Sequence, residues 1–267
     1  MRRSGWFGVL LAGALALALL FLTVPVVAIF ANTAPLELAR SLRDESSREA
    51  LRLSLECSAI AVALIVAVGT PAAYLLATRS FRGRAAVVTL VELPLVLPPA
   101  VAGIGLLAAL GPRGLLGGLV EDAGVRLVLT TAGVICALTF VAAPFYLRQA
   151  QAAFEALDRT WLDAARTLGD TEARSFRRVA IPSAGPGLVA GVALAWGRAL
   201  GEFGATLMFA GSFRGVTQTV PLAIYERFAT DFTGALALSA VLVAVSGALL
   251  LSVKLVSGSA WLGGAAR

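Results

Sequence analysis

The sequence contains no histidine, and only 14% of its 267 residues are charged. Without imidazole, Ser-His-Asp triads, histidine-ligated zinc sites and the usual neutral-pH general base are excluded. The two cysteines, Cys57 and Cys136, lie in separate apolar runs, which gives neither a thiolate metal site nor a disulfide framework. Lys254 is the only lysine, and it belongs to no Gly-x-x-x-x-Gly-Lys-Ser/Thr phosphate-binding loop. These absences argue against a self-contained enzyme.

Hydrophobic residues make up 58% of the chain. That count omits glycine, which the usual apolar share of about 45–50% includes, so a water-soluble fold could not bury them all. A helix needs about 20 mostly apolar residues to cross the hydrocarbon core. Six runs qualify: Phe7–Ala31, Leu55–Ala77, Ala85–Leu110, Leu127–Leu147, Leu188–Ala210 and Gly234–Val253. The sequence therefore predicts an all-α integral membrane protein with six transmembrane helices.

The distribution of basic side chains predicts the orientation of these spans. Lysine and arginine are more frequent in the segments on one side, namely 1–6, 78–84, 148–187 and 254–267. The segments on the other side, 32–54, 111–126 and 211–233, have a similar total length and fewer basic residues. By the positive-inside rule, both termini are predicted to be cytoplasmic. The net charge of +6 reflects this asymmetry and anionic lipid, and nothing in the sequence indicates nucleic acid.

Three regions follow from this topology. The first apolar run is far longer than the roughly 7–15 residues of a cleavable signal peptide, so we expect a retained anchor helix. The predicted division is an anchor helix with the first outer loop (1–54), a transmembrane core (55–253) and a cytoplasmic tail (254–267).

The segment 148–187 is the longest predicted cytoplasmic connection, and it has helical periodicity. Its apolar stripe comprises Phe154, Leu157, Trp161, Ala165 and Leu168. Gly169 is expected to end this helix, and Asp170 is expected to be the N-cap of a second one. Pro182 and Pro186 are expected to end the second helix before the fifth span. Composition alone leaves two interpretations: interfacial helices resting on lipid headgroups, or a surface that docks another protein.

One spacing in this segment favours docking. Asp163-Ala164-Ala165 is followed after three residues by Gly169, and after nine more by Val179-Ala180-Ile181-Pro182. This resembles the signature Glu-Ala-Ala-x3-Gly-x9-Ile-x-Leu-Pro of permeases in ATP-binding cassette importers, with mild changes at positions 163, 179 and 181. The resemblance implies a coupling loop that lies in a cleft on a separate ATPase subunit. Its coupling residues would be Asp163, Ala164, Ala165, Gly169, Asp170 and Pro182.

Ionisable residues inside the predicted spans need a reason, since each costs about 2.5–3.5 kcal/mol on insertion scales. Arg198 and Glu202 lie four residues apart on the fifth span and can neutralise one another. The pair is either a structural link between helices or part of an anion route to which Arg198 gives positive potential. Glycines on the same span form a small-residue face that favours close helix packing: Gly187, Gly191, Gly197, Gly201 and Gly204.

The third span contains three prolines within six residues, Pro94, Pro98 and Pro99. They must interrupt the helical hydrogen bonds, and a broken backbone at membrane depth is tolerated where it is buried in protein or lines a cavity. We expect a gate region here, with Thr206 opposite it. The alternative is a kink without a transport role. Glu92, just before the prolines, is expected to cap or pair with an unidentified neighbour.

Residues 196–211, 217–225 and the stretch 94–99 resemble, more narrowly, the permease subunit of molybdate importers, and the similarity covers roughly residues 50–255. Ser212 departs from the asparagine that relatives often have there. Sulfate and tungstate permeases are similar. The resemblance implies a homodimer in the cytoplasmic membrane with the route at its interface. It also implies two cytoplasmic ATPase subunits that use ATP and Mg, an extracytoplasmic oxyanion-binding protein, and no cofactor on this chain.

Two other classes remain as alternatives. A stand-alone secondary transporter or channel predicts inverted repeats and several paired ionisable groups at mid-membrane, and the sequence offers few such groups and no convincing repeat. A membrane-embedded enzyme would depend on isolated carboxylates at Glu92 or Glu202.

Overall fold

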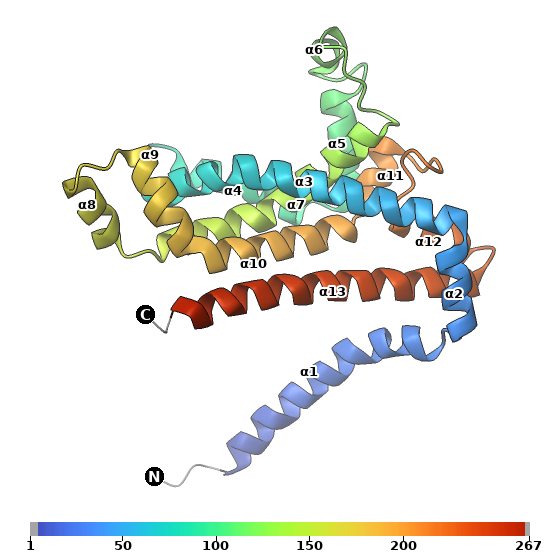
Figure 1. Cartoon of the computed structure of the whole chain (residues 1–267). Helices are drawn as coiled ribbons and strands as arrows, with labels where there is room; N and C mark the ends of the chain where they lie inside the picture. The colour runs from blue at the N-terminus through green and yellow to red at the C-terminus, as the bar shows by residue number, and fades with distance from the viewer. Residues whose placement is uncertain (1–4, 265–267) are drawn as a thin grey trace.

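The computed structural model describes residues 5–264, which fold into helices joined by short connections (Figure 1). The helices are α1 (Gly5–Ala31), α2 (Pro35–Arg43), α3 (Glu45–Thr78), α4 (Arg84–Val96), α5 (Pro99–Leu110), α6 (Gly117–Asp122), α7 (Thr131–Glu155), α8 (Arg159–Thr167), α9 (Glu172–Ser175), the π-helical turn η1 (Phe176–Ala180), α10 (Ile181–Leu200), α11 (Gly204–Ala210), α12 (Val220–Phe228) and α13 (Phe232–Gly264). Within residues 5–264 there is no strand, as the apolar runs predicted. Among the helices of this described part, five are long and apolar enough to cross a membrane, and the bent pair α4–α5 would make a sixth span.

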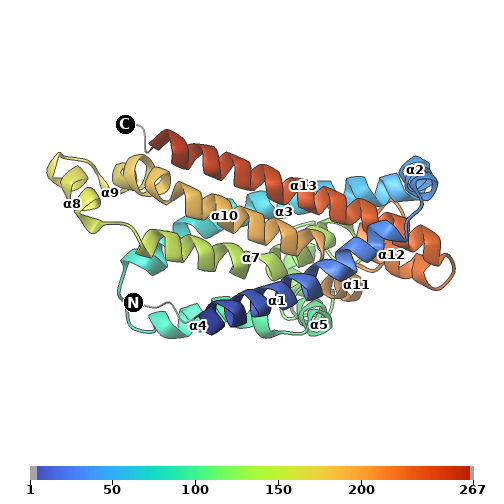
Figure 2. The ribbon, with the colours of Figure 1, turned by 90° about the horizontal axis from the view of Figure 1, so that it is seen from below.

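Helix α7 packs along both α3 and α10, and the three helices lie side by side (Figures 1 and 2). Its Tyr146 is almost fully buried, and the hydroxyl lies 2.6 Å from Oγ1 of Thr70 on α3. Glycines allow this close packing, because a Cβ at Gly69 or Gly191 would lie 2.9 Å or 3.1 Å from the Tyr146 ring. The indole of Trp196 on α10 donates to Oγ of Ser58 on α3 at 2.9 Å. These polar contacts fix the register of three apolar helices.

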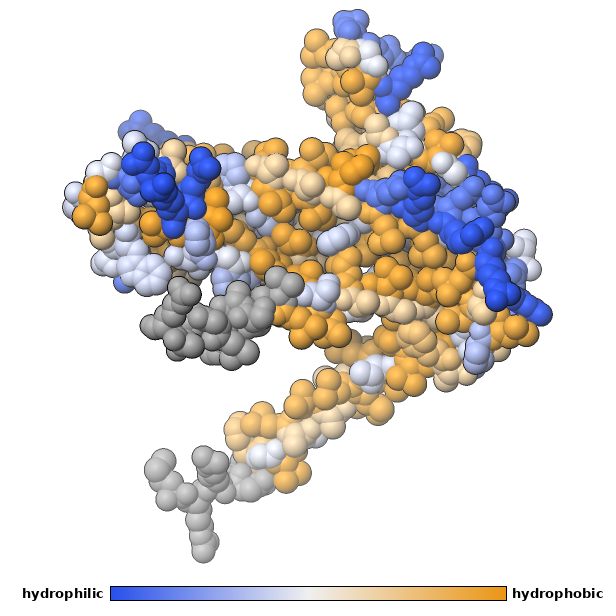
Figure 3. Space-filling model, viewed as in Figure 1, coloured by the Kyte–Doolittle hydropathy of each residue, from blue (hydrophilic) through white to orange (hydrophobic). Residues whose placement is uncertain are grey.

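The face of the bundle shown in Figure 3 is mostly apolar along its length, and hydrophilic residues gather at its two ends and around α6. At one end lie α8 and α9, and we call this the loop end. The opposite end carries α2, the start of α3, and α12. A belt of exposed apolar side chains between two polar ends is the distribution expected of a membrane-spanning bundle.

At the end opposite the loop end, Asp44 joins three helices. Its carboxylate accepts the Ser47 amide at the start of α3 (3.1 Å) and pairs with Arg227 of α12. Partial burial alone would raise the pKa of Asp44. The hydrogen bonds from Arg227, Ser46 and Ser47 outweigh it and hold the pKa well below its usual range. The α2–α3 corner therefore stays clamped to α12 at neutral pH.

The helices differ from the predicted spans at the ends of the fourth and fifth. The fourth span does not end at Leu147, because α7 continues to Glu155. The fifth does not continue to Ala210, because α10 ends at Leu200 and a new helix, α11, starts at Gly204. The predicted end of the sixth span at Val253 agrees with the candidate span Phe232–Val253, although helix α13 itself continues to Gly264. The predicted tail 254–267 is thus helical to residue 264, and its last three residues lie outside the described part.

The prolines that were expected to stop the helix before the fifth span do not stop it. A single helical segment extends from Glu172 to Leu200, with Pro182 in the first turn of α10 and Pro186 inside it. The π turn η1 precedes Pro182, and there the amide of Ile181 donates to the carbonyl of Phe176. A π turn shifts the hydrogen-bond register by one residue, which lets a helix continue past a residue without an amide donor.

Candidate functional site

The predicted break in the third span is present, but only two of its three prolines coincide with it. Helices α4 and α5 meet at Leu97 and Pro98 with a bend of 118°. Leu97 is extended (φ −69°, ψ 132°), as expected for a residue before proline, and Pro98 is the N-cap of α5. Pro94 lies inside α4. The consecutive prolines Pro98 and Pro99 remove two backbone N–H donors in succession, whereas α4 continues past the single Pro94.

The start of α5 packs against α11, so the predicted gate elements do meet. A Cβ on Gly204 would lie 2.8 Å from Cβ of Pro99, and one on Gly103 would lie 2.7 Å from the Ala205 carbonyl oxygen. Thr206, on α11, is fully buried. The crossing is therefore formed by backbone in direct contact, and it has no space for a larger residue.

Arg198 and Glu202 form the expected ion pair, at 2.5 Å between Nη2 and Oε2. Glu202 is 1% exposed, while the Arg198 side chain is 25% exposed. The second carboxylate oxygen, Oε1, accepts the amide of Ala205 at 2.7 Å and so caps α11. Glu202 therefore lies in the α10–α11 break, where it accepts from the first turn of α11 and is the counter-ion of Arg198.

The glycine face of the fifth span is only partly a packing face. Gly187 and Gly191 lie against Ala153 and Tyr146 of α7. Gly197 has no heavy atom within 4 Å of an added Cβ, so α10 is open at this point.

Two glycines on α5 give a matched test of the crossing. Gly103→Ala should lower the thermal unfolding midpoint in detergent, because overpacking a close contact costs about 1–3 kcal/mol. Gly105 has no atom within 4 Å of an added Cβ, so Gly105→Ala should leave the midpoint unchanged or raise it, given alanine's helix propensity. Equal shifts for the two variants would contradict the close crossing of α5 and α11.

The loop end has the predicted helix, bend, helix pattern, but the residues of the predicted apolar stripe are divided between α7 and α8. Leu162 and Ala165 are the buried residues of α8, while Trp161 and Leu168 are 56% and 88% exposed. Ala164 and Asp163 are also exposed. The reason is that Phe154 belongs to α7, so α8 starts at Arg159 and a different face of it turns inward. Two large apolar side chains are thus exposed on this helix.

The bend after α8 is made by Gly169 in the left-handed region (φ +89°), with no atom within 4 Å of an added Cβ. Asp170 is not the N-cap of α9 as expected. Thr171 has that role, accepting the amide of Arg174 at 3.4 Å, while Asp170 lies 3.3 Å from the Arg174 guanidinium. At the start of α8, the Asp158 carboxylate accepts the Thr160 amide (2.9 Å), which lowers the pKa of Asp158.

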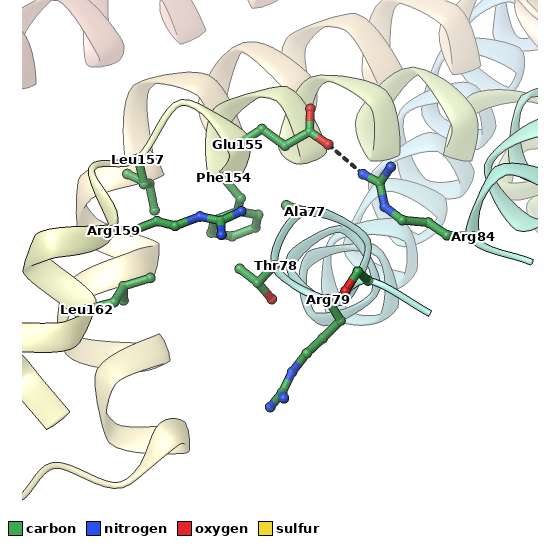
Figure 4. Close-up of a pocket in the computed structure, with 10 residues that line it drawn as sticks. Ala77, Thr78, Arg79, Arg84, Phe154, Glu155, Leu157, Arg159 and Leu162 are labelled. Atoms are coloured by element: carbon green, nitrogen blue, oxygen red, sulfur yellow. Dashed lines mark hydrogen bonds and ion pairs between the residues drawn. The ribbon is translucent and has the colours of Figure 1, made fainter. Parts of the chain in front are cut away.

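Long-range ion pairs fasten this loop to the bundle. Both carboxylate oxygens of Glu172 accept from Arg79 after α3, at 2.6 and 2.7 Å, and Glu155 pairs with Arg84 at 2.7 Å. Between them is a cavity of about 390 Å³, into which Arg159 projects from α8 (Figure 4). The sequence does not reveal these pairs, because the partners are 71 and 93 residues apart.

Within the part of the chain that the structure describes, no three His, Cys, Asp or Glu residues are grouped so that they could hold a metal ion. Both cysteines are free thiols. Glu92 lies near Arg148 of α7, at 3.3 Å. The sequence indicated that Glu92 needs a partner but did not identify it. Arg148 was assigned to the predicted loop 148–187, whereas in the structure it lies inside α7.

Comparison with known proteins gives consistent matches. Residues 65–258 match the family model described as "Binding-protein-dependent transport system inner membrane component". The "Molybdenum transport system permease protein ModB" of Mycobacterium tuberculosis is 40% identical over 235 residues, covering 88% of this chain and 89% of that protein. A probable molybdenum ABC transporter permease protein of Haloferax volcanii is 39% identical over 259 residues, covering 96% and 92%.

A solved structure has the same fold. It is a bacterial ABC transporter involved in the import of the acidic polysaccharide alginate, with a TM-score of 0.73, 19% identity, and coverage of 97% of this chain and 96% of that one. At this identity the likeness concerns the fold alone.

Proposed function

Because the chain belongs to the family of binding-protein-dependent transport system inner membrane components, we propose that it is the permease subunit of an ATP-driven importer of molybdate or tungstate. It is a multi-pass protein of the cytoplasmic membrane. The observation that carries the substrate is the 40% identity, across 88% of this chain, to a molybdenum permease. Transport is the activity of this subunit, and ATP hydrolysis belongs to a separate one.

The route lies between two copies of the chain. Helix α4 has no buried residue, and α5 has three, so much of both helices remains uncovered in one copy. Exposed apolar side chains line them, including Val96 (79%) and Ile104 (55%). A second copy would cover this surface, with α1 as a peripheral anchor of the core 55–253. The gate would comprise Pro94, Pro98, Pro99, Arg198, Glu202 and Thr206.

Helix α8, Gly169 and α9 form the coupling loop on the cytoplasmic side, and both termini are on that side. Exposed Trp161 and Leu168 support this role, since they offer apolar area to a protein partner. The ATPase partners would contact Asp163, Ala164, Ala165, Gly169 and Asp170, and Pro182 would lie where the loop continues into α10. The partners use ATP and Mg, and an oxyanion-binding protein would dock at the opposite end.

Reconstitution tests this function. The chain should be placed in liposomes with its ATPase subunit, and the binding protein and labelled molybdate supplied outside. We expect ATP-dependent uptake that unlabelled tungstate suppresses and sulfate suppresses much less. Uptake suppressed equally by sulfate would make this a sulfate permease. Uptake by the chain alone, driven by an ion gradient, would overturn the proposal in favour of a secondary transporter.

A further inference from the structure

The ion pair of Glu92 and Arg148 lies at membrane depth. Glu92 is eight residues from the start of α4, and Arg148 is seven residues from the end of α7, both counted from the loop end. At about 1.5 Å per residue, both Cα atoms are roughly 10–12 Å inside the bundle. Helix α7 has 25 residues and is somewhat longer than a hydrocarbon core of about 30 Å. If the core is centred on α7, the pair lies inside its half nearer the loop end.

This pair is not covered by the chain that carries it. The Arg148 side chain is 61% exposed and that of Glu92 is 36% exposed. Ionised groups at such depth face a bundle interior or a water-filled cavity rather than lipid. The exposed side of the pair therefore indicates the direction of an aqueous space.

The contacts of α7 locate that space. Gly69 of α3 lies against Tyr146 and Leu147, and Gly191 of α10 lies against Tyr146 and Gln149. Those residues account for two sides of α7. Arg148 and Ala152, four residues apart and hence on one face, are exposed. This exposed face of α7 adjoins α4, whose Glu92 pairs with Arg148.

Arg198 lies beside the same helix, nearer the other end. Gly191 contacts α7 at the level of Tyr146 and Gln149, which is also the level of Arg148. Arg198 is seven residues beyond Gly191 on the same face of α10, or about 10 Å farther along the axis. Two arginines, each paired with one glutamate, thus follow one another along the bundle.

We propose that Arg148 is a second oxyanion-binding residue on the translocation route, on the loop-end side of the gate. This inference rests on the proposed function. A guanidinium has five N–H donors. The shortest contact of Arg148 with Glu92 is 3.3 Å, from Nε, and among the described residues no hydrogen bond from Arg148 accompanies this ion pair, so its donors are available to a tetrahedral oxyanion. Glu92 offsets the charge of Arg148, which keeps the attraction weak enough for release, as conduction through successive sites requires.

Thiol accessibility tests the location. In the reconstituted complex, with Cys57 and Cys136 replaced by alanine, Arg148→Cys should react with a water-soluble methanethiosulfonate reagent, and molybdate should slow the reaction. Val68→Cys, at a 70% exposed apolar position of α3, is the matched lipid-facing control and should not react. If Arg148→Cys is as unreactive as this control, the side chain faces lipid and the proposal is overturned.

Transport tests the role. Arg148→Gln should reduce molybdate uptake about tenfold or more, since hydrogen bonds to a charged group are lost. Arg148→Lys should retain part of the uptake because the positive charge remains. Arg82→Gln removes an exposed arginine in the turn between α3 and α4, outside the proposed route and the coupling loop, and should leave uptake unchanged. A purely structural Arg148 would be indicated if the glutamine and lysine variants lost uptake equally together with their thermal stability.

The two proposals fail in different ways. If the wild-type complex does not take up molybdate, the proposed function is wrong. If it does, and Arg148→Gln transports normally, only the role of Arg148 is wrong.

Discussion

Gly169→Val is expected to uncouple ATP hydrolysis from transport in the reconstituted complex. Gly169 has φ +89°, a conformation that costs a residue with a Cβ about 1–2 kcal/mol and a β-branched residue more. A cost of about 1.4 kcal/mol changes the population of the bent loop tenfold. Molybdate uptake should therefore fall at least about tenfold, while ATP hydrolysis continues. Uptake and hydrolysis are measured on the same vesicles.

The chain contains a matched control for this substitution. Gly83, in the turn between α3 and α4, has φ +86° and likewise no atom within 4 Å of an added Cβ. Gly83→Val introduces the same backbone strain at the same end of the bundle, outside α8 and α9. It should preserve coupling. If it uncouples to the same extent, general strain and not the coupling loop is responsible, and unchanged uptake by Gly169→Val would remove this loop from the mechanism.

Breaking the Arg198–Glu202 pair should have the second large effect. Glu202 is 1% exposed, so Arg198→Gln leaves a buried carboxylate without its cation, a change that typically costs about 3–5 kcal/mol. Glu202→Gln should cost less, because glutamine retains an acceptor for the Ala205 amide and the 25% exposed Arg198 can reach water. Thermal unfolding in detergent measures the difference between the two variants.

The double variant separates the structural from the functional interpretation. Arg198→Gln with Glu202→Gln has no buried charge, so its stability should recover relative to Arg198→Gln alone. If the pair also serves the anion route, molybdate uptake should stay low despite that recovery. Recovery of both stability and uptake would make the pair a structural link only.

Residues close together in the sequence gave reliable predictions. The apolar runs predicted an all-helical bundle, consecutive prolines predicted the α4–α5 break, and the spacing of Arg198 and Glu202 predicted their pairing. In each case the chemistry is local, since a missing donor or a four-residue separation acts within one or two helical turns.

Helix ends and buried faces were predicted less well. Asp170 was expected to cap α9 and Thr171 does. Trp161 and Ala165 were expected on one apolar stripe, but Ala165 is buried in the chain whereas Trp161 is exposed. The fifth span was expected to be continuous, but Glu202 caps a new helix there. Several local signals compete at such positions, and packing against other helices decides between them.

The sequence by itself determined the class of protein, the number of apolar runs and the bend at Gly169, because hydropathy and backbone sterics depend on the residue and its near neighbours. Only the tertiary structure decided which charges meet across the bundle: Arg79 with Glu172, Arg84 with Glu155, and Arg148 with Glu92. Those pairs depend on the rotation and depth of helices that are far apart in the chain. Their register is set by glycine contacts around Tyr146, which hydropathy does not encode.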